Sequence, residues 1–426
     1  MNLTAAITLV TLALMRMPVF VVIAAAALWG FYRQEIHLSV VAVEIYRITE
    51  TPILLALPLF SFAGYLLAET RASQRLFRVS QALLGWLPAG LPIITLLCCT
   101  FFTAITGASG VTIVAIGALI YPALQQAGYE RKFCLGLVCA SGSLGLLLAP
   151  SMPLILYGVV VQQMDLPVTL ELTDLFLAGL VPMALMLILL SVWSYWTVRH
   201  LPAVRTSFDV GELKAALWEA RAELPFPFVL LGCIYGGWVT LSEAAAVTVI
   251  YVLLVESLFY REISLRKLPP VLVKSSVLVG EIILILAVAL AFSNLLVDAG
   301  IPGQLFELIR NHVDSKYSFL LLLNGVLLLL GAFLDIFSAI VIVVPLLLPV
   351  AVAYDIHPVH LGIVFLANMQ LGYFTPPVGM NLFIASARLK EPITTIYRAS
   401  WPFFVVLLIA VLLISYIPLL SLWWAT

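Results

Sequence analysis

The sequence predicts an all-α polytopic membrane protein made of two inverted repeats, and two observations lead to this fold class. About 63% of the 426 residues are hydrophobic and only 10% are charged, whereas a soluble domain carries roughly a quarter charged residues. The apolar residues lie in long runs separated by short polar or Pro/Gly segments, and both halves show the same order of runs and breaks. We expect most of this apolar surface to face lipid.

The first half, residues 1–200, contains four continuous apolar runs and two broken ones. The continuous runs, which we interpret as membrane spans, are residues 3–15, 19–32, 43–68 and 175–198. Between the third and fourth spans, residues 71–87 alternate arginines with apolar residues, which predicts an amphipathic arm helix along the interface. The broken runs are residues 91–125, interrupted at 106–110, and residues 133–161, interrupted at 149–151.

After a polar cytoplasmic connector, residues 201–224, the same order begins again in residues 225–426. The predicted spans are residues 226–239, 244–260, 272–297 and 403–424, with a short amphipathic arm at 301–313. The broken runs are residues 319–353, interrupted near Asp335, and residues 361–387, interrupted at 375–379. An offset of about 227 residues aligns Pro122 with Pro349 and Pro150 with Pro377, which indicates an internal repeat.

The distribution of charge predicts how the chain lies in the membrane. If residues 91–125 and 319–353 are re-entrant hairpins, 17 of the 21 basic residues share one face, which is then cytoplasmic by the positive-inside rule. Arg33, Arg47, Arg310 and Lys316 take the other face. Both termini are then periplasmic, and an odd number of crossings in each half inverts the second half, as in many secondary transporters.

The four breaks are the best candidate sites, because an interrupted membrane helix leaves carbonyl and amide groups that hydrocarbon cannot satisfy. Freed carbonyls can coordinate Na⁺, and half-helix N-termini favour anions. The candidate ligands of two or more Na⁺ are Thr106, Gly107, Ser109, Gly145, Pro150, Asp335, Ser338, Gly372, Thr375 and Gly379. The candidate substrate contacts are Ser109, Ser151, Asn381 and Arg388.

Each break has an alternative explanation as a packing kink, since Gly, Ser and Pro are common in membrane helices. Asp335 could equally serve a site or cap a half-helix, and Glu281 could face either the protein interior or a wet boundary. His357 and His360 lie beside a loop and fit interface positions better than metal ligands. The net charge of −1 predicts no nucleic-acid partner, and no P-loop or organic-cofactor motif occurs.

At these breaks the sequence resembles the large membrane subunit of tripartite ATP-independent periplasmic (TRAP) transporters, over nearly the whole chain. The stretches that carry the resemblance are Pro58-Leu59-Phe60 through Gly64, Thr106-Gly107-Ala108-Ser109-Gly110 running to Pro122, Ser242-Glu243-Ala244-Ala245-Ala246-Val247, Leu334-Asp335 through Pro345 and Pro349, and Thr375-Pro376-Pro377-Val378-Gly379-Met380-Asn381-Leu382-Phe383. The first tip departs from the family, which often has Ser-Gly-Ser-Ala followed by an Asp; here Thr112 or a neighbour replaces that acid.

The resemblance implies an elevator-type fold like that of the ion transporter superfamily, in which hairpins and broken helices carry substrate and Na⁺ past a static scaffold. It implies a bacterial inner-membrane location and two protein partners, a small membrane subunit and a periplasmic substrate-binding protein. The substrate would be an organic acid, either a dicarboxylate or a sugar acid. A stand-alone ion-coupled carboxylate carrier is the alternative. An intramembrane protease is disfavoured, because neither a second intramembrane Asp opposite Asp335 nor an H-E-x-x-H motif is present.

Overall fold

A computed structural model describes residues 11–12, 15, 17–49, 51–87, 89–164, 170–200, 208–264, 266–313 and 315–424. The predicted span at residues 3–15 lies almost wholly outside the described residues, as do both ends of the chain. The described part is helical and contains no strand. Seven of its helices are long and apolar enough to cross a membrane, or up to nine if each of two bent helix pairs counts as one span.

The first half follows the predicted order, with one span divided in two. Its helices are α2 (Val19–Arg33), α3 (Ser39–Thr49), α4 (Ala56–Ala68), α5 (Ala72–Leu84), α6 (Gly90–Thr106), α7 (Ser109–Thr112), α8 (Ala118–Gln126), α9 (Arg131–Ser141), α10 (Met152–Gln162) and α11 (Leu172–Val198). The predicted span at residues 43–68 is not continuous: α3 ends at Thr49, and a 3₁₀ turn, Pro52–Leu55, precedes α4, so the two helices form a bent pair. Proline disfavours helical backbone at the residue before it, which explains the interruption at Thr51.

The connector and the second half repeat this plan. The connector contains α12 (Val210–Glu219), and the helices that follow are α13 (Phe226–Tyr235), α14 (Leu241–Leu254), α15 (Leu268–Asp298), α16 (Ile301–Arg310), α17 (Lys316–Phe333), α18 (Ile336–Ala353), α19 (Pro358–Gly372), α20 (Met380–Leu389), α21 (Ile393–Tyr416) and α22 (Leu419–Leu422). Arm helices α5 and α16 occupy corresponding places in the two halves. The inverted relation between the halves stays a prediction.

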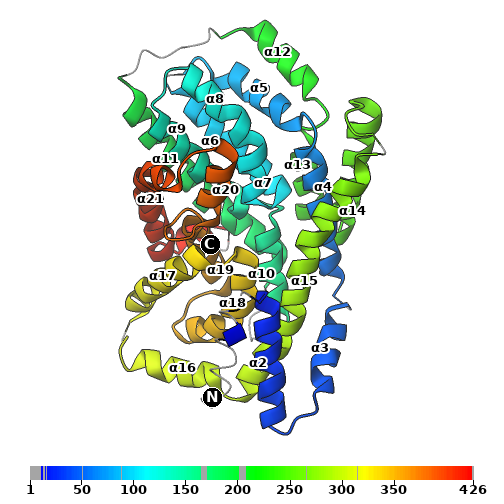
Figure 1. The fold of residues 1–426 in the computed structure, drawn as a ribbon, viewed down its shortest axis with the longest axis vertical. Coiled ribbons are helices and arrows are strands. Elements are labelled where there is room, and N and C mark those ends of the chain that lie inside the picture. The colour runs from blue at the N-terminus through cyan, green and yellow to red at the C-terminus, as the bar shows by residue number, and fades with distance from the viewer. Residues whose placement is uncertain are drawn as a thin grey trace.

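The helices form two groups that lie side by side (Figure 1). The scaffold group is α2, α3, α4, α13, α14 and α15, in which α4 packs on α14 and α15, and α15 packs on α2 and α3. The broken-helix group comprises α6 to α11 and α17 to α22, held together by contacts such as α9 with α21, α10 with α18 and α17 with α19. Arms α5 and α16 connect the groups at opposite ends of the molecule (Figure 1). Arg75 and Arg78 of α5 and Lys214 of α12 thus lie at the end opposite Arg310 of α16, an arrangement consistent with the charge prediction.

The Ser242-Glu243-Ala244-Ala245 phrase has a structural explanation in the scaffold group. The Thr240 side chain accepts from the Glu243 backbone N–H while the Glu243 carboxylate accepts from the Thr240 backbone N–H, which is a capping box at the start of α14. Ala244 and Ala245 are fully buried and, being small, let α14 approach α4 closely. The phrase therefore builds the scaffold rather than a binding site.

A buried ion cluster fastens arm α5 to the scaffold group. Arg75 is only 4% exposed, and its guanidinium lies 2.5 Å from Glu223, 2.5 Å from Glu262 and 3.3 Å from Glu256. Its Cζ also lies 3.9 Å from the centre of the Tyr260 ring. These carboxylates belong to the end of the connector, the end of the α14 segment and the loop after it. One guanidinium thus neutralises part of a larger buried negative charge.

We expect Arg75→Met to destabilise the protein strongly, because it leaves buried carboxylates without a counter-charge. The loss for breaking a buried pair is about 3–5 kcal/mol. Thermal unfolding of the detergent-solubilised protein measures the effect. Arg78→Met is the matched control on the same helix: Arg78 binds Glu212 and Glu219, but all three side chains are between 43% and 47% exposed, so water screens the pair. Equal losses in the two variants would contradict a stabilising role for the buried cluster.

Candidate functional site

The first break is a sharp turn between α6 and α7. Gly107 ends α6 with φ of +66°, a conformation that favours glycine, and its N–H bonds to the Thr103 carbonyl at 2.7 Å. Helix α8 returns toward the end of the molecule where α6 begins (Figure 1). The Thr106 hydroxyl is buried and has no hydrogen-bond partner among the described residues. An unpartnered buried oxygen of this kind is a candidate ligand for a cation.

The second break separates α17 from α18 at Leu334 and Asp335. The Asp335 carboxylate caps α18: one oxygen accepts from the Ser338 backbone N–H at 2.9 Å, and the other accepts from the Ser338 hydroxyl. The Ile336 backbone N–H donates to the Tyr373 hydroxyl at 2.8 Å. Asp335 therefore has the predicted capping role, and its carboxylate also borders the cavity described below.

Of the other two breaks, the one between α9 and α10 is longer than predicted, and the one between α19 and α20 begins two residues before its predicted position. Residues 142–151 between α9 and α10 contain only a 3₁₀ turn, Leu144–Leu147, because glycine and serine propagate a helix poorly and Pro150 lacks an N–H. Residues 373–379 separate α19 from α20. Their turn is held by the Gly379 N–H, which donates to the Ala332 carbonyl beside the second tip at 3.1 Å, and by the Thr375 hydroxyl, which donates to the Leu371 carbonyl at 2.8 Å.

Hydrogen bonds bring the first tip to both long breaks. The Thr103 hydroxyl lies 2.7 Å from the Thr112 hydroxyl and donates to the Gly142 carbonyl at 2.9 Å. The Ser109 hydroxyl donates to the Asn381 side-chain oxygen at 2.8 Å, across 272 residues of sequence. The Asn381 side-chain nitrogen is buried without a partner among the described residues. Two predicted substrate contacts, Ser109 and Asn381, thus touch each other.

Both tips border one cavity of about 750 Å³ between the broken-helix group and the scaffold group. The first tip contributes residues 107–111, the second contributes Asp335, Ile336 and Phe337, and helices α4 and α15 form the opposite wall. A volume of this size is typical of small-molecule sites. The charged residues of its lining are Glu69, Lys274, Glu281, Asp335 and Arg388.

The predicted site residues divide between this cavity and the packing around it. Gly107, Ser109, Asp335 and Arg388 line it. Asn381, Thr106, Ser338, Thr375 and Gly379 lie in or beside the same breaks without lining it. Arg388 reaches the first hairpin, because its Nε donates to the Val114 carbonyl at 3.2 Å.

Four predicted site residues serve the packing of the breaks in this structure. A Cβ on Gly145 would lie 2.1 Å from the Thr100 carbonyl oxygen, and one on Gly372 would lie 2.6 Å from the Gly331 backbone, so both glycines allow close helix contact. The Ser151 hydroxyl is buried and donates to the Leu146 carbonyl at 2.6 Å. Pro150 lines a different, apolar cavity.

Sequence reasoning missed the scaffold side of the cavity. Lys274, Tyr65 and Glu69 line it, and so does Glu281, which the sequence left unassigned between the interior and a wet boundary. Glu281 is exposed to the cavity. Lys274 and Glu281 are seven residues apart, so they share one face of α15. Two charged residues seven apart inside a predicted membrane span were the sequence signal that could have identified this wall of the cavity.

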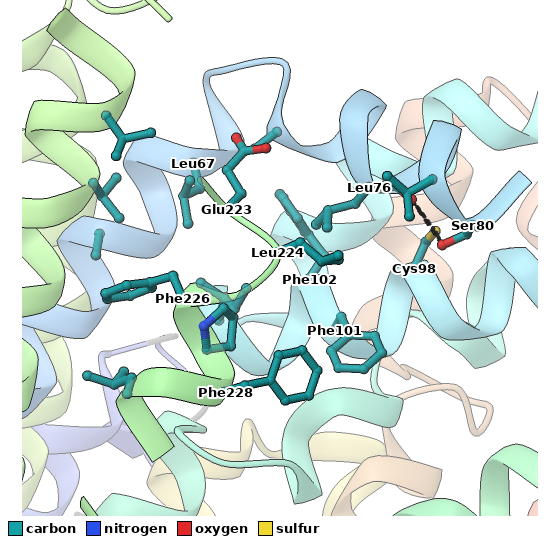
Figure 2. A pocket seen from close by; sticks show the side chains of 18 of the residues that line it. Leu67, Leu76, Ser80, Cys98, Phe101, Phe102, Glu223, Leu224, Phe226 and Phe228 are labelled. Atoms are coloured by element: carbon teal, nitrogen blue, oxygen red, sulfur yellow. Dashed lines mark hydrogen bonds between the residues drawn. The ribbon is translucent and has the colours of Figure 1, made fainter. Parts of the chain in front are cut away.

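The second, apolar cavity has about 360 Å³ and lies between arm α5, helix α6 and the scaffold helices α13 and α14. Figure 2 shows its lining, in which Phe101 of α6 and Phe228 of α13 face each other with ring centres 6.4 Å apart. Ser80 and Cys98 hydrogen-bond to each other at 3.2 Å. With so few polar groups, this cavity does not suit a polar solute.

The two histidines have structural partners. His360 is buried, with Nδ1 2.6 Å from the Ser421 hydroxyl and Nε2 3.2 Å from the Ser415 carbonyl. His357 caps α19 by accepting from the Val359 N–H. The described residues contain no group of three or more His, Cys, Asp or Glu side chains that could hold a metal ion.

A family model for the DctM component of the tripartite ATP-independent periplasmic transporters matches residues 6–420. The chain belongs to this family. It is a multi-pass TRAP permease subunit, as the sequence resemblance predicted, and the resemblance is thereby confirmed.

The permease is similar in sequence to several curated proteins over most of its length. It is 34% identical to the C4-dicarboxylate TRAP transporter large permease of Pseudomonas aeruginosa, over 89% of this chain and 88% of that one. It is 30% identical to the sialic acid TRAP transporter large permease of Vibrio cholerae, over 86% and 84% of the two chains. It is 32% identical to the isethionate TRAP transporter permease DctMQ of Oleidesulfovibrio alaskensis, but spans only 58% of that longer protein.

The permease also shares its fold with a solved transporter. The crystal structure of YdaH from Alcanivorax borkumensis, described as a transporter of unusual topology, aligns with a TM-score of 0.62 over 88% of this chain and 85% of that one. The two sequences are 15% identical, so the match bears on the fold alone. It supports the predicted class of all-α polytopic membrane protein.

We expect Gly64→Ala to reduce transport severalfold without unfolding the permease. Gly64 lies on α4, where an added Cβ would come within 2.5 Å of the Thr106 Cα and 2.9 Å of the Ile105 carbonyl oxygen. The first tip would have to move away from the scaffold group, at a cost of about 1–3 kcal/mol. Gly325→Ala in α17 is the control, because no atom lies within 4 Å of its added Cβ. Substrate uptake into proteoliposomes compares the two; equal uptake would show that the close Gly64 contact does not matter.

Proposed function

We propose that this permease imports an organic acid anion across the bacterial inner membrane by Na⁺ symport, with an elevator movement of the broken-helix group past the scaffold group. A periplasmic substrate-binding protein would deliver the anion, and a small membrane subunit would complete the assembly. The observation that carries the proposal is the cavity of about 750 Å³ that both tips and two scaffold helices line.

The charge of the cavity supports coupling to a cation. Its described lining carries three carboxylates, Glu69, Glu281 and Asp335, and two basic groups, Lys274 and Arg388, so its formal charge is −1. An incoming organic acid anion adds to this negative charge. Cations bound at the breaks would offset it, and helix breaks provide the carbonyl and hydroxyl oxygens that Na⁺ prefers.

The driving force for import depends on the net charge of the substrate and its co-transported Na⁺. Each positive charge that moves inward across 100 mV supplies about 2.3 kcal/mol. Two or more Na⁺ per monoanion, or three or more per dianion such as succinate, therefore make import electrogenic and allow steep accumulation. The candidate ligands are the oxygens around the tips, above all the unpartnered Thr106 hydroxyl and the break at Thr375.

The connectivity supports an elevator movement. The chain passes between the groups through the short arms α5 and α16 at opposite ends (Figure 1) and through the connector between α11 and α13. The cavity lies on the surface where the groups meet. The scaffold group also presents large exposed apolar side chains, including Trp29, Ile250 and Val277. These suit contact with lipid and with a small membrane subunit.

The stand-alone carrier remains the second candidate, and one reconstitution separates the two. The permease and the small subunit encoded beside it are placed in liposomes, and uptake of labelled succinate or N-acetylneuraminate is followed with and without a Na⁺ gradient and the cognate binding protein. Uptake that needs both additions supports the tripartite symporter. Uptake by the permease alone supports the carrier, and uptake driven only by a proton gradient contradicts Na⁺ coupling.

Thr375→Ala tests the proposed Na⁺ ligands. Loss of one oxygen ligand should raise the Na⁺ concentration for half-maximal uptake by about tenfold, which corresponds to about 1.4 kcal/mol, with little change in thermal stability. Thr394→Ala is the control, an exposed threonine at the start of α21. A Na⁺ dependence that is the same in both variants would remove Thr375 from the site.

A further inference from the structure

The wall of the cavity opposite the tips carries an ion pair of the scaffold group. The Lys274 Nζ lies 2.6 Å from the Glu69 Oε1, and the two side chains are 56% and 45% exposed. Lys274 lies in the second turn of α15, and Glu69 is the residue that follows the last turn of α4. Both line the cavity, so the pair is open to any solute that enters it.

The position of Glu69 is unfavourable for the stability of α4. Its own backbone N–H bonds to the Tyr65 and Leu66 carbonyls, which places its carboxylate at the negative end of the helix. A carboxylate there is disfavoured, and a basic residue or glycine is preferred. Helix capping therefore does not explain Glu69, and its pairing with Lys274 is the interaction that the structure offers instead.

The pair is also weak enough to exchange partners. Two half-exposed charges in contact with water gain little from each other, in contrast to the buried cluster around Arg75. A carboxylate that enters the cavity can take the place of Glu69 on the Lys274 ammonium, and the Glu69 carboxylate then returns to water. No buried charge is left unpaired by this exchange.

The charges on the two walls fit an anion between them. Among the described residues of the scaffold wall, Lys274 is the one basic group, beside Glu69 and Glu281. On the broken-helix wall Arg388 uses its Nε for the Val114 carbonyl, and its guanidinium has further N–H donors. Basic groups on both walls therefore face the same space.

We propose that Lys274 is an anion-binding residue of the scaffold group, which exchanges the Glu69 carboxylate for a carboxylate of the substrate. This inference rests on the proposed function and assigns the scaffold a direct contact with the transported anion. Glu69 acts as the competitor: it keeps Lys274 paired when the cavity is empty, and it displaces the anion when the anion leaves.

The experiment measures equilibrium binding of radiolabelled succinate, N-acetylneuraminate and isethionate to the detergent-solubilised permease. The anion with the strongest saturable binding to the wild-type protein is then compared among variants. We expect Lys274→Gln to raise its Kd by about two- to fivefold and Glu69→Gln to lower it by about two- to fivefold, the range expected for half-exposed ion pairs. Lys274→Arg should keep near-normal binding, and Lys267→Gln, outside the cavity on the same end of α15, should change nothing.

The opposite changes in Kd expected for the two variants distinguish anion binding by Lys274 from a purely structural role of the ion pair. If the pair only joins α4 to α15, Lys274→Gln and Glu69→Gln weaken binding alike, and the charge-swapped variant Glu69→Lys with Lys274→Glu restores it; that result overturns the inference. If Lys274 binds the anion, the swapped variant regains thermal stability but does not regain normal affinity. Absence of saturable binding to the wild-type protein counts instead against the proposed substrate class, and the inference fails with it.

Discussion

A helix that is interrupted within a membrane leaves backbone and hydroxyl groups that lipid cannot satisfy, and the architecture of this permease follows from that constraint. The polar groups at its helix breaks hydrogen-bond to one another. The first tip bonds to the α9–α10 break through Thr103 and Gly142, and to the α19–α20 break through Ser109 and Asn381. The second tip bonds to the α19–α20 break through Tyr373 and Gly379. The breaks therefore gather in one place.

Because the helices form two groups, the clustered breaks border a cavity instead of being buried on every side. The breaks lie in the broken-helix group, the scaffold group supplies a wall with Lys274 and Glu281, and the cavity lies between them. Close glycine contacts such as Gly64 against Thr106 let the first tip lie against the scaffold. In the proposed elevator, the polar contacts within the broken-helix group are retained during movement, while the proposed contact between Lys274 and the substrate is made and released.

Much of the fold could be predicted from the sequence, because hydropathy and Pro/Gly positions are local properties. The arms, both tips and the α19–α20 break were placed within a few residues. The division of the 43–68 run and the length of the 142–151 break were missed, although Pro52 and the glycine and serine residues after Ser141 are local signals of an interruption, because the apolar residues around them continue the pattern of a span. The candidate site was only partly predictable. The seven-residue spacing of Lys274 and Glu281 marks one face of α15, but the contacts of Ser109 with Asn381 and of Lys274 with Glu69 join residues 272 and 205 apart, which no local pattern records.

Side-specific labelling of a single cysteine tests the account most directly. Val114 lines the cavity on the first hairpin and is 41% exposed, and Cys233 is the one native cysteine among the described residues that is not buried. The Val114→Cys, Cys233→Ala variant would be exposed to a membrane-impermeant maleimide in inside-out and right-side-out vesicles. Glu69 and Lys274 of the cavity lie beside arm α5, whose end the charge distribution assigns to the cytoplasm. The account therefore predicts labelling from the cytoplasmic side, and a shift to the periplasmic side under Na⁺ and substrate conditions that drive transport. Labelling from the same single side under every condition would contradict an alternately accessible cavity.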